Sequence, residues 1–164
     1  MTDYNPVTLE HALEGTYSHV SPHSAFEGLS IELAGKNIES CPFTIWQILC
    51  HIVNWQDIFI AKVQSWPEPV HNTATDGWTA AAAPKDEAEW NEMLKKFLDG
   101  IEFAKHLAKT GSTLLSVEIP AKGPVTGYDA LHSMASHNSY HLGEIVMIRR
   151  MLNVWPPPSG GMTW

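Results

Sequence analysis

The chain is short of cysteine, of positive charge and of long apolar runs. Its 164 residues include two cysteines, Cys41 and Cys50, which form no Cys-x-x-Cys pair and no disulfide framework for a domain of this size. Ten Lys and Arg stand against 18 Asp and Glu, which gives a formal net charge of -8. Because nucleic-acid affinity depends mostly on clustered Lys and Arg, neither nucleic acids nor anionic membranes are expected as partners.

Two further absences concern location and domain structure. No uninterrupted apolar run approaches the length of a membrane span, and no basic segment followed by an apolar one resembles a secretory signal. We therefore expect a cytoplasmic protein with no membrane partner. No repeat or linker divides the sequence, so residues 1–164 are expected to form a single domain with one core.

Apolar spacing and capping residues predict four substantial helices. Pairs typical of capping boxes are Thr44 with Gln47, Asp86 with Glu89, and Thr126 with Asp129. The long segment from Trp66 to Pro84 is irregular, as functional loops often are, and residues 113–120 suit either a short strand or an extended crossover. The predicted helices span about residues 7–20, 44–66, 86–109 and 126–154, with one or two shorter helices within 21–34. These helices and their long connections predict an all-α four-helix bundle.

Histidine is abundant, with nine residues, and two of them lie four apart in the last predicted helix. His137 and His141 share one helical face, so that both imidazoles reach one cation. Their face also carries apolar residues, which predicts that it points inward. Asn138 stands where a zincin has its glutamate, which disfavours peptide hydrolysis of that type. In a chain rich in histidine, this pair alone is a weak motif.

His51 strengthens the metal hypothesis, because it lies on the inward face of the second long helix with Ile48 and Trp55. Three histidines from two helices, with a coordination position left for solvent, make the composition of a catalytic metal site. The alternative is a purely structural bundle in which the three are packed core residues.

Three segments together carry a family resemblance. They are TIWQILCHIVNWQDIFIAKV, HNSYHLGEIVMIRRML and WPPPSGGMTW, in that order. In this order they resemble the DinB/YfiT-like superfamily over nearly the whole chain. The family pattern of one histidine on the second helix and a His-x3-His on the fourth maps onto His51, His137 and His141.

The resemblance implies an up-down-down-up bundle that holds a divalent metal ion, often nickel or zinc, and is frequently a homodimer. Family activities include thiol S-transferases that use low-molecular-weight thiols and maleylpyruvate isomerases, and many other members are described as metal-dependent hydrolases without a demonstrated substrate. For this chain a small-molecule substrate is expected, with hydrolysis and thiol transfer both open. A non-catalytic metal-dependent binding or stress-response protein is the alternative function.

A few other residues are candidates for the site. Glu144, one turn beyond His141, is the carboxylate expected near the metal and the candidate catalytic residue, with a solvated or capping charge as the alternative. Trp55 and Trp164 are candidate pocket walls, and Trp78 lies in an irregular segment that could cover the site. Cys50 is expected to be a buried, inert thiol.

Overall fold

The architecture comes from a computed structural model, which describes residues 5–64, 77–110 and 126–160. Three long helices form most of it: α4 (Ile45–Gln64), α5 (Glu87–Thr110) and α7 (Gly127–Met151). The shorter helices are α1 (Pro6–Glu14), α2 (Pro22–Phe26) and α3 (Ile31–Ala34). All regular secondary-structure elements in these ranges are helices, so the all-α prediction is confirmed.

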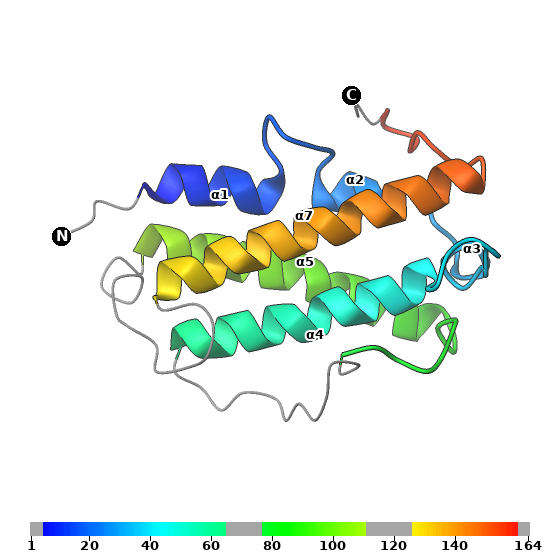
Figure 1. Ribbon diagram of the computed structural model, residues 1–164, viewed down its shortest axis with the longest axis horizontal. Helices are drawn as coiled ribbons and strands as arrows, with labels where there is room; N and C mark the ends of the chain where they lie inside the picture. Colours follow the sequence, from blue (N-terminus) through cyan, green and yellow to red (C-terminus); the bar gives the residue numbers. More distant parts are fainter. Residues whose placement is uncertain (1–4, 65–76, 111–125, 161–164) are drawn as a thin grey trace.

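Four of these helices form the bundle. α4 packs against α5 and α7, and α1 packs against the same two helices from the other side. Figure 1 shows that α1 and α7 run in one direction while α4 and α5 run in the other, which is the up-down-down-up order. Because α4 and α5 are parallel, the end of α4 at Gln64 and the start of α5 at Glu87 lie at opposite ends of the bundle. None of the described helices is long and apolar enough to cross a membrane.

Local signals explain where the long helices begin. Thr44 and Gln47 form a reciprocal capping box, in which the Thr44 amide donates to Gln47 Oε1 and the Gln47 amide donates to Thr44 Oγ1. Thr126 and Asp129 form a second one. At α5 only half of the predicted box forms: the Glu89 amide donates to Asp86 Oδ1, while the Glu89 carboxylate accepts from the Lys85 amide.

The predicted end of the first helix was wrong. α1 ends at Glu14 rather than near Val20, because Gly15 adopts a left-handed conformation with a φ of 74°. A Cβ on Gly15 would lie 2.3 Å from the His19 ring, so the close return of the chain also requires glycine. α7 also ends slightly earlier than predicted, at Met151. Residues 113–120 lie outside the described residues.

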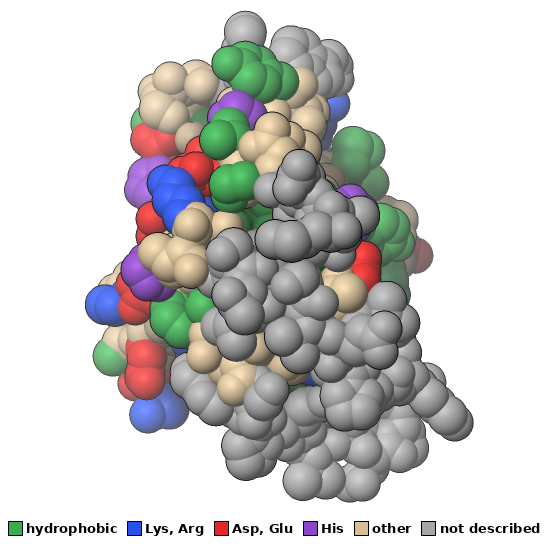
Figure 2. Space-filling view, turned by 90° about the vertical axis from the view of Figure 1, so that its left-hand side faces the viewer, with side chains coloured by type: hydrophobic (Ala, Val, Ile, Leu, Met, Phe, Trp, Pro, Cys, Tyr) green, Lys and Arg blue, Asp and Glu red, His purple; other side chains and the backbone are tan. Residues whose placement is uncertain are grey.

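The core fills the space between the bundle helices. Ile45, Leu49 and Ile52 of α4 are fully buried, as are Phe97 of α5 and Leu131 of α7. At the end of the bundle seen in Figure 2, acidic, basic and histidine side chains are interspersed on the described part of the surface. Among the polar side chains buried with this core are His51 of α4 and His141 of α7, which belong to the site described next.

Candidate metal centre

Three histidines meet inside the bundle, between α4 and α7. His51 is 7% exposed at the middle of α4, and His141 is 6% exposed one turn after His137 on α7. The Nε2 atoms of His51 and His137 are 3.3 Å apart. The His141 ring centroid lies 4.5 Å from that of His137 and 4.8 Å from that of His51. The spacing of His137 and His141 and the inward face of His51 thus bring all three together.

The separation of these nitrogens suits one metal ion. Two nitrogens bound at about 2.0–2.1 Å to a tetrahedral zinc ion are roughly 3.3–3.4 Å apart. His51 and His137 already have this separation. One ligand atom from each of the three residues lies within 4.8 Å of the others. The widest pair would therefore have to close by up to about 1.5 Å to reach tetrahedral spacing.

Burial keeps two of the imidazoles neutral. The pKa of His51 is lowered from 6.5 to about 4, chiefly by burial and to a smaller extent by the charge of His141, while hydrogen bonding with the Gly77 backbone opposes the shift. The pKa of His137 is lowered to about 3, chiefly by burial and then by the charges of His141 and His51. At neutral pH both rings consequently carry a free lone pair, which is the form that binds metal.

The outer nitrogens of the rings have different surroundings. His141 Nδ1 donates a hydrogen bond of 2.7 Å to Glu144 Oε2, so its Nε2 faces the cluster as an acceptor. The Nδ1 atoms of His51 and His137 have no hydrogen-bond partner among the described residues. Gly77 lies beside His51, where a Cβ would be 3.3 Å from Nδ1. A buried nitrogen without a partner is costly, and a metal bound between the facing Nε2 atoms would leave both Nδ1 atoms in need of an acceptor.

The segment after Gly77 covers one side of the cluster. Trp78 stacks on His51 with the ring centroids 3.9 Å apart, and it also stacks on Phe43 at 3.6 Å. The segment is held to α4 because Thr44 Oγ1 donates to the Ala82 carbonyl and Gln47 Nε2 donates to the Thr79 carbonyl, at 2.6 and 3.1 Å. Thr44 and Gln47, which cap α4, thus also hold the segment after Gly77 in place beside the cluster.

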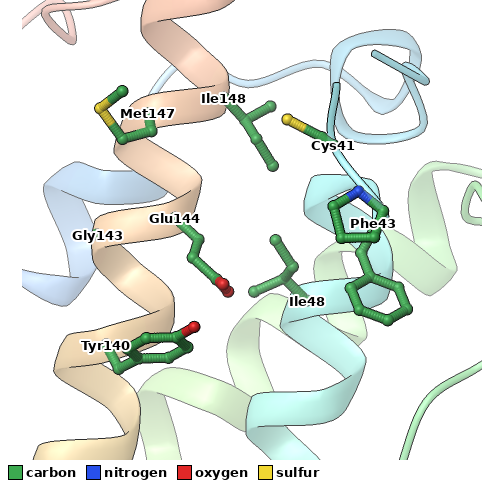
Figure 3. A pocket seen from close by; sticks show the side chains of 9 residues that line it. Cys41, Phe43, Ile48, Tyr140, Gly143, Glu144, Met147 and Ile148 are labelled. Carbon is green, nitrogen blue, oxygen red and sulfur yellow. The ribbon is translucent and has the colours of Figure 1, made fainter. Parts of the chain in front are cut away.

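A cavity of about 440 Å³ lies beside the cluster, between α4 and the C-terminal half of α7. Figure 3 shows the Glu144 carboxylate projecting from α7 toward Ile48 on the opposite wall, with Tyr140 next to it. The negative charge and hydrogen bonding of Glu144 raise the pKa of Tyr140. Glu144 thus contacts both His141 and the cavity. Nine residues line this space: Cys41, Pro42, Phe43, Ile48, Tyr140, Gly143, Glu144, Met147 and Ile148.

The two cysteines differ in their surroundings. Burial raises the pKa of Cys50 to about 12, with a smaller effect of Glu89, so this thiol stays protonated and inert. Cys41 lies in the cavity wall, where its Sγ is 3.7 Å from Met151 Sδ. Of the two, only Cys41 therefore lies where a bound molecule would touch it.

The predicted pocket walls are placed only in part. The Trp55 ring lies 5.8 Å from that of His137 and 6.3 Å from that of His51, on the cluster rather than in the cavity wall. Trp164 lies outside the described residues. Sequence reasoning missed the roles of Phe43 and Tyr140, because their contacts depend on how the helices pack.

Comparison with known proteins identifies the family. No curated protein and no solved structure matches the chain. The family model described as the DinB superfamily matches residues 11–145, a range that contains His51, His137, His141 and Glu144. Since that range is most of the sequence, the chain belongs to the DinB superfamily.

Proposed function

We propose that this protein is a metal-dependent enzyme in which His51, His137 and His141 hold one divalent ion, zinc or nickel. The observation that carries the proposal is the cluster itself: three histidines with their ligand atoms within 4.8 Å, two of them kept neutral by burial. Imidazole nitrogen suits both metals. Three protein ligands leave one coordination position open, as in catalytic rather than structural zinc sites.

A divalent ion at this place supplies a Lewis acid, which lowers the pKa of a water or thiol bound next to it. The chain's own residues orient the ligands and the substrate. Glu144 fixes the tautomer of His141 through Nδ1, and its carboxylate also lines the cavity. The cavity binds the apolar part of a small-molecule substrate, since its size is within the usual range for ligand pockets.

Of hydrolysis and thiol S-transfer, the two reactions left open for this chain, the cavity favours thiol S-transfer. Its walls are mostly apolar, and its carboxylate already accepts a hydrogen bond from His141. An apolar electrophile fits such walls, and a low-molecular-weight thiol is the second substrate. The thiolate sulfur attacks the electrophilic carbon, the leaving group departs with its bonding pair, and the thiol proton goes to solvent. Hydrolysis is the second candidate, favoured by Glu144 as a base close to the cluster.

The first experiment measures metal content and turnover together. Purified protein is expected to contain close to one zinc or nickel per chain, and a variant with all three histidines changed to alanine is expected to contain none. Turnover of thiol–electrophile pairs, or of an ester panel, is expected to disappear with a chelator and return with metal. Equal metal content in the wild type and the triple variant would contradict the proposal. Metal binding without turnover would favour a binding protein.

A second experiment tests the cavity. Cys41→Phe places a large side chain into it from a loop, and Cys41→Ser is the matched control. We expect the Phe variant to raise KM or abolish turnover with its metal content unchanged, while the Ser variant behaves like the wild type. Equal activity of both variants would place the substrate elsewhere.

The family resemblance and the two free cysteines support a cytoplasmic homodimer as part of the proposal. Tyr140, Met147 and Met151 are large apolar side chains exposed on α7, and a second copy packed near them would lie beside the cavity mouth. Sedimentation velocity is expected to give twice the monomer mass, and a monomer at micromolar concentration would contradict this part.

A further inference from the structure

A chain of side-chain amides crosses the core next to the histidine cluster. Gln56 of α4 donates from Nε2 to the Phe97 carbonyl of α5, at 3.1 Å. Asn138 of α7 donates from Nδ2 to Gln56 Oε1, at 2.9 Å. Gln56 is 1% exposed and Asn138 is 2% exposed. Amides buried this deeply are costly unless they are hydrogen-bonded, so their arrangement is tightly defined.

The backbone of α5 fixes which way both amides face. A carbonyl oxygen only accepts, so Gln56 must direct Nε2 to Phe97 and Oε1 to Asn138. Asn138 must then direct Nδ2 to Gln56, and its Oδ1 is left on the other side. Gly100 makes room for this, since a Cβ there would lie 2.6 Å from Gln56 Nε2.

The oxygen left over is the part of Asn138 that concerns the site. Asn138 Oδ1 is buried without a hydrogen-bond partner, and so is Nδ1 of the neighbouring residue His137. The first can only accept and the second can donate. In agreement, the Asn138 side chain raises the pKa of His137 against the lowering caused by burial, as an acceptor near the ring does.

We propose that Asn138 and Gln56 are positioning residues for His137. Asn138 Oδ1 and His137 Nδ1–H, the two unpartnered atoms, would pair with each other, and this would leave the Nε2 lone pair of His137 directed at His51. Gln56 holds the Asn138 amide in that orientation from the opposite side of the core. Glu144 serves His141 in the same manner. The role of this orientation in metal binding rests on the proposed function, whereas the assignment of the His137 proton to Nδ1 is independent of it.

The tautomer is tested first, in metal-free protein, by long-range proton–nitrogen NMR of the histidine rings. We expect His137 to carry its proton on Nδ1, so that any proton shared between the two facing Nε2 atoms belongs to His51. Asn138→Leu and Gln56→Met are expected to lose this preference, because the first removes the acceptor and the second removes the amide that orients it. A His137 protonated on Nε2 in the wild type would overturn the proposal.

Metal affinity is the second readout, measured by competition with a chromophoric chelator for zinc. Loss of a group that orients a metal ligand typically weakens affinity about 10- to 100-fold, and we expect this range for Asn138→Leu and Gln56→Met. Leu131→Ala is the control, because Leu131 is fully buried on α7 and belongs to no polar network described above. We expect it to lower stability and leave affinity unchanged.

Each outcome of these measurements is decisive. Unchanged affinity in both amide variants, or an equal loss in Leu131→Ala, would overturn the positioning role. If Asn138→Leu does not fold, the Gln56→Met variant alone provides the test, since Gln56 is not next to a histidine in the sequence. If the wild type binds neither zinc nor nickel, the proposed function fails, and the tautomer measurement still decides this inference.

Discussion

At the scale of single residues, the site depends on the two nitrogens of each imidazole having separate tasks. Nε2 of His51 and Nε2 of His137 face each other, and the contact with Glu144 leaves Nε2 of His141 on the same side. The Nδ1 atoms point outward, and what they contact determines the tautomer. A residue next to the three histidines can therefore determine which nitrogen is free for the proposed metal, and among the described residues Glu144 has a direct hydrogen bond to one of these Nδ1 atoms.

Glu144→Gln separates the charge of this residue from its hydrogen bond. The amide oxygen can still accept from His141 Nδ1, so we expect metal affinity to fall by about tenfold, the lower end of the usual range. The pKa of Tyr140 is expected to fall toward its ordinary value, since Glu144 is what raises it. Zinc competition and an ultraviolet titration of tyrosine measure the two effects.

The same variant tests Glu144 as a general base. If the carboxylate takes a proton from water, kcat should fall by two to four orders of magnitude while metal content stays near one per chain. A kcat within a few-fold of the wild type would leave Glu144 with an orienting role alone.

The low pKa values of His51 and His137 make stability depend on pH in metal-free protein. In the unfolded chain both titrate near 6.5, whereas in the folded chain their pKa values are about 4 and about 3. The unfolded state therefore binds more protons below pH 6.5, and stability should decrease as the pH falls from about 6.5 to about 3. Urea denaturation at several pH values measures this decrease, and a His51→Ala, His137→Ala double variant should show a shallower one. Equal slopes would contradict the assigned pKa shifts.

At the scale of helices, two interior glycines provide a matched pair. A Cβ at Gly143 of α7 would meet nothing within 4 Å, whereas at Gly100 of α5 it would lie 2.6 Å from Gln56 Nε2. Gly143→Ala is expected to stabilise the protein by up to about 1 kcal/mol, through helix propensity alone. Gly100→Ala should gain less, or lose stability, because it displaces the buried Gln56 amide. Denaturant midpoints compare the two directly, and equal gains would argue against a tightly held amide network.

The helix ends show which features of the fold could be predicted from sequence patterns. The capping boxes at Thr44 and Thr126 are local, so they could be predicted, and the structure has both. The end of α1 at Gly15 was missed because the His19 ring closes on that glycine only after the chain turns back.

In the site, too, features set by local sequence patterns could be predicted, and contacts set by packing could not. Spacing on one helix, together with the inward face of another, brought His51, His137 and His141 together as predicted, and their binding of metal remains a prediction. The amide chain was not foreseen, since the contact of Asn138 with Gln56 depends on packing between residues 82 positions apart. A polar residue on each of two apolar faces was the available signal.

At the scale of the whole molecule, Arg149 joins segments that are distant in sequence. The residue is 2% exposed, and its guanidinium donates to the carbonyls of Ala25 and Glu27 near α2 and to that of Val154 beyond α7. Arg149→Met keeps much of the volume and leaves these carbonyls without their donor. We expect a loss of about 3 kcal/mol, which corresponds to a Tm lower by roughly 6–12 °C. Circular dichroism measures the Tm, and zinc affinity of the folded variant should not change. A Tm within about 2 °C of the wild type would show that the segments hold together without this residue.

Metal binding should raise the stability of the entire fold, because the three proposed ligands come from two helices that approach each other only in the folded bundle. A ligand that binds the native state alone stabilises it by about 2.7 kcal/mol at 100 times its Kd. For a chain of this length that corresponds to a Tm higher by roughly 5–11 °C. Scanning calorimetry with zinc, with nickel and with chelator should show this rise in the wild type and none in the triple histidine-to-alanine variant. An unchanged Tm in the wild type would mean that the three rings are packed core residues. A rise of similar size in the triple variant would instead place the metal elsewhere on the chain.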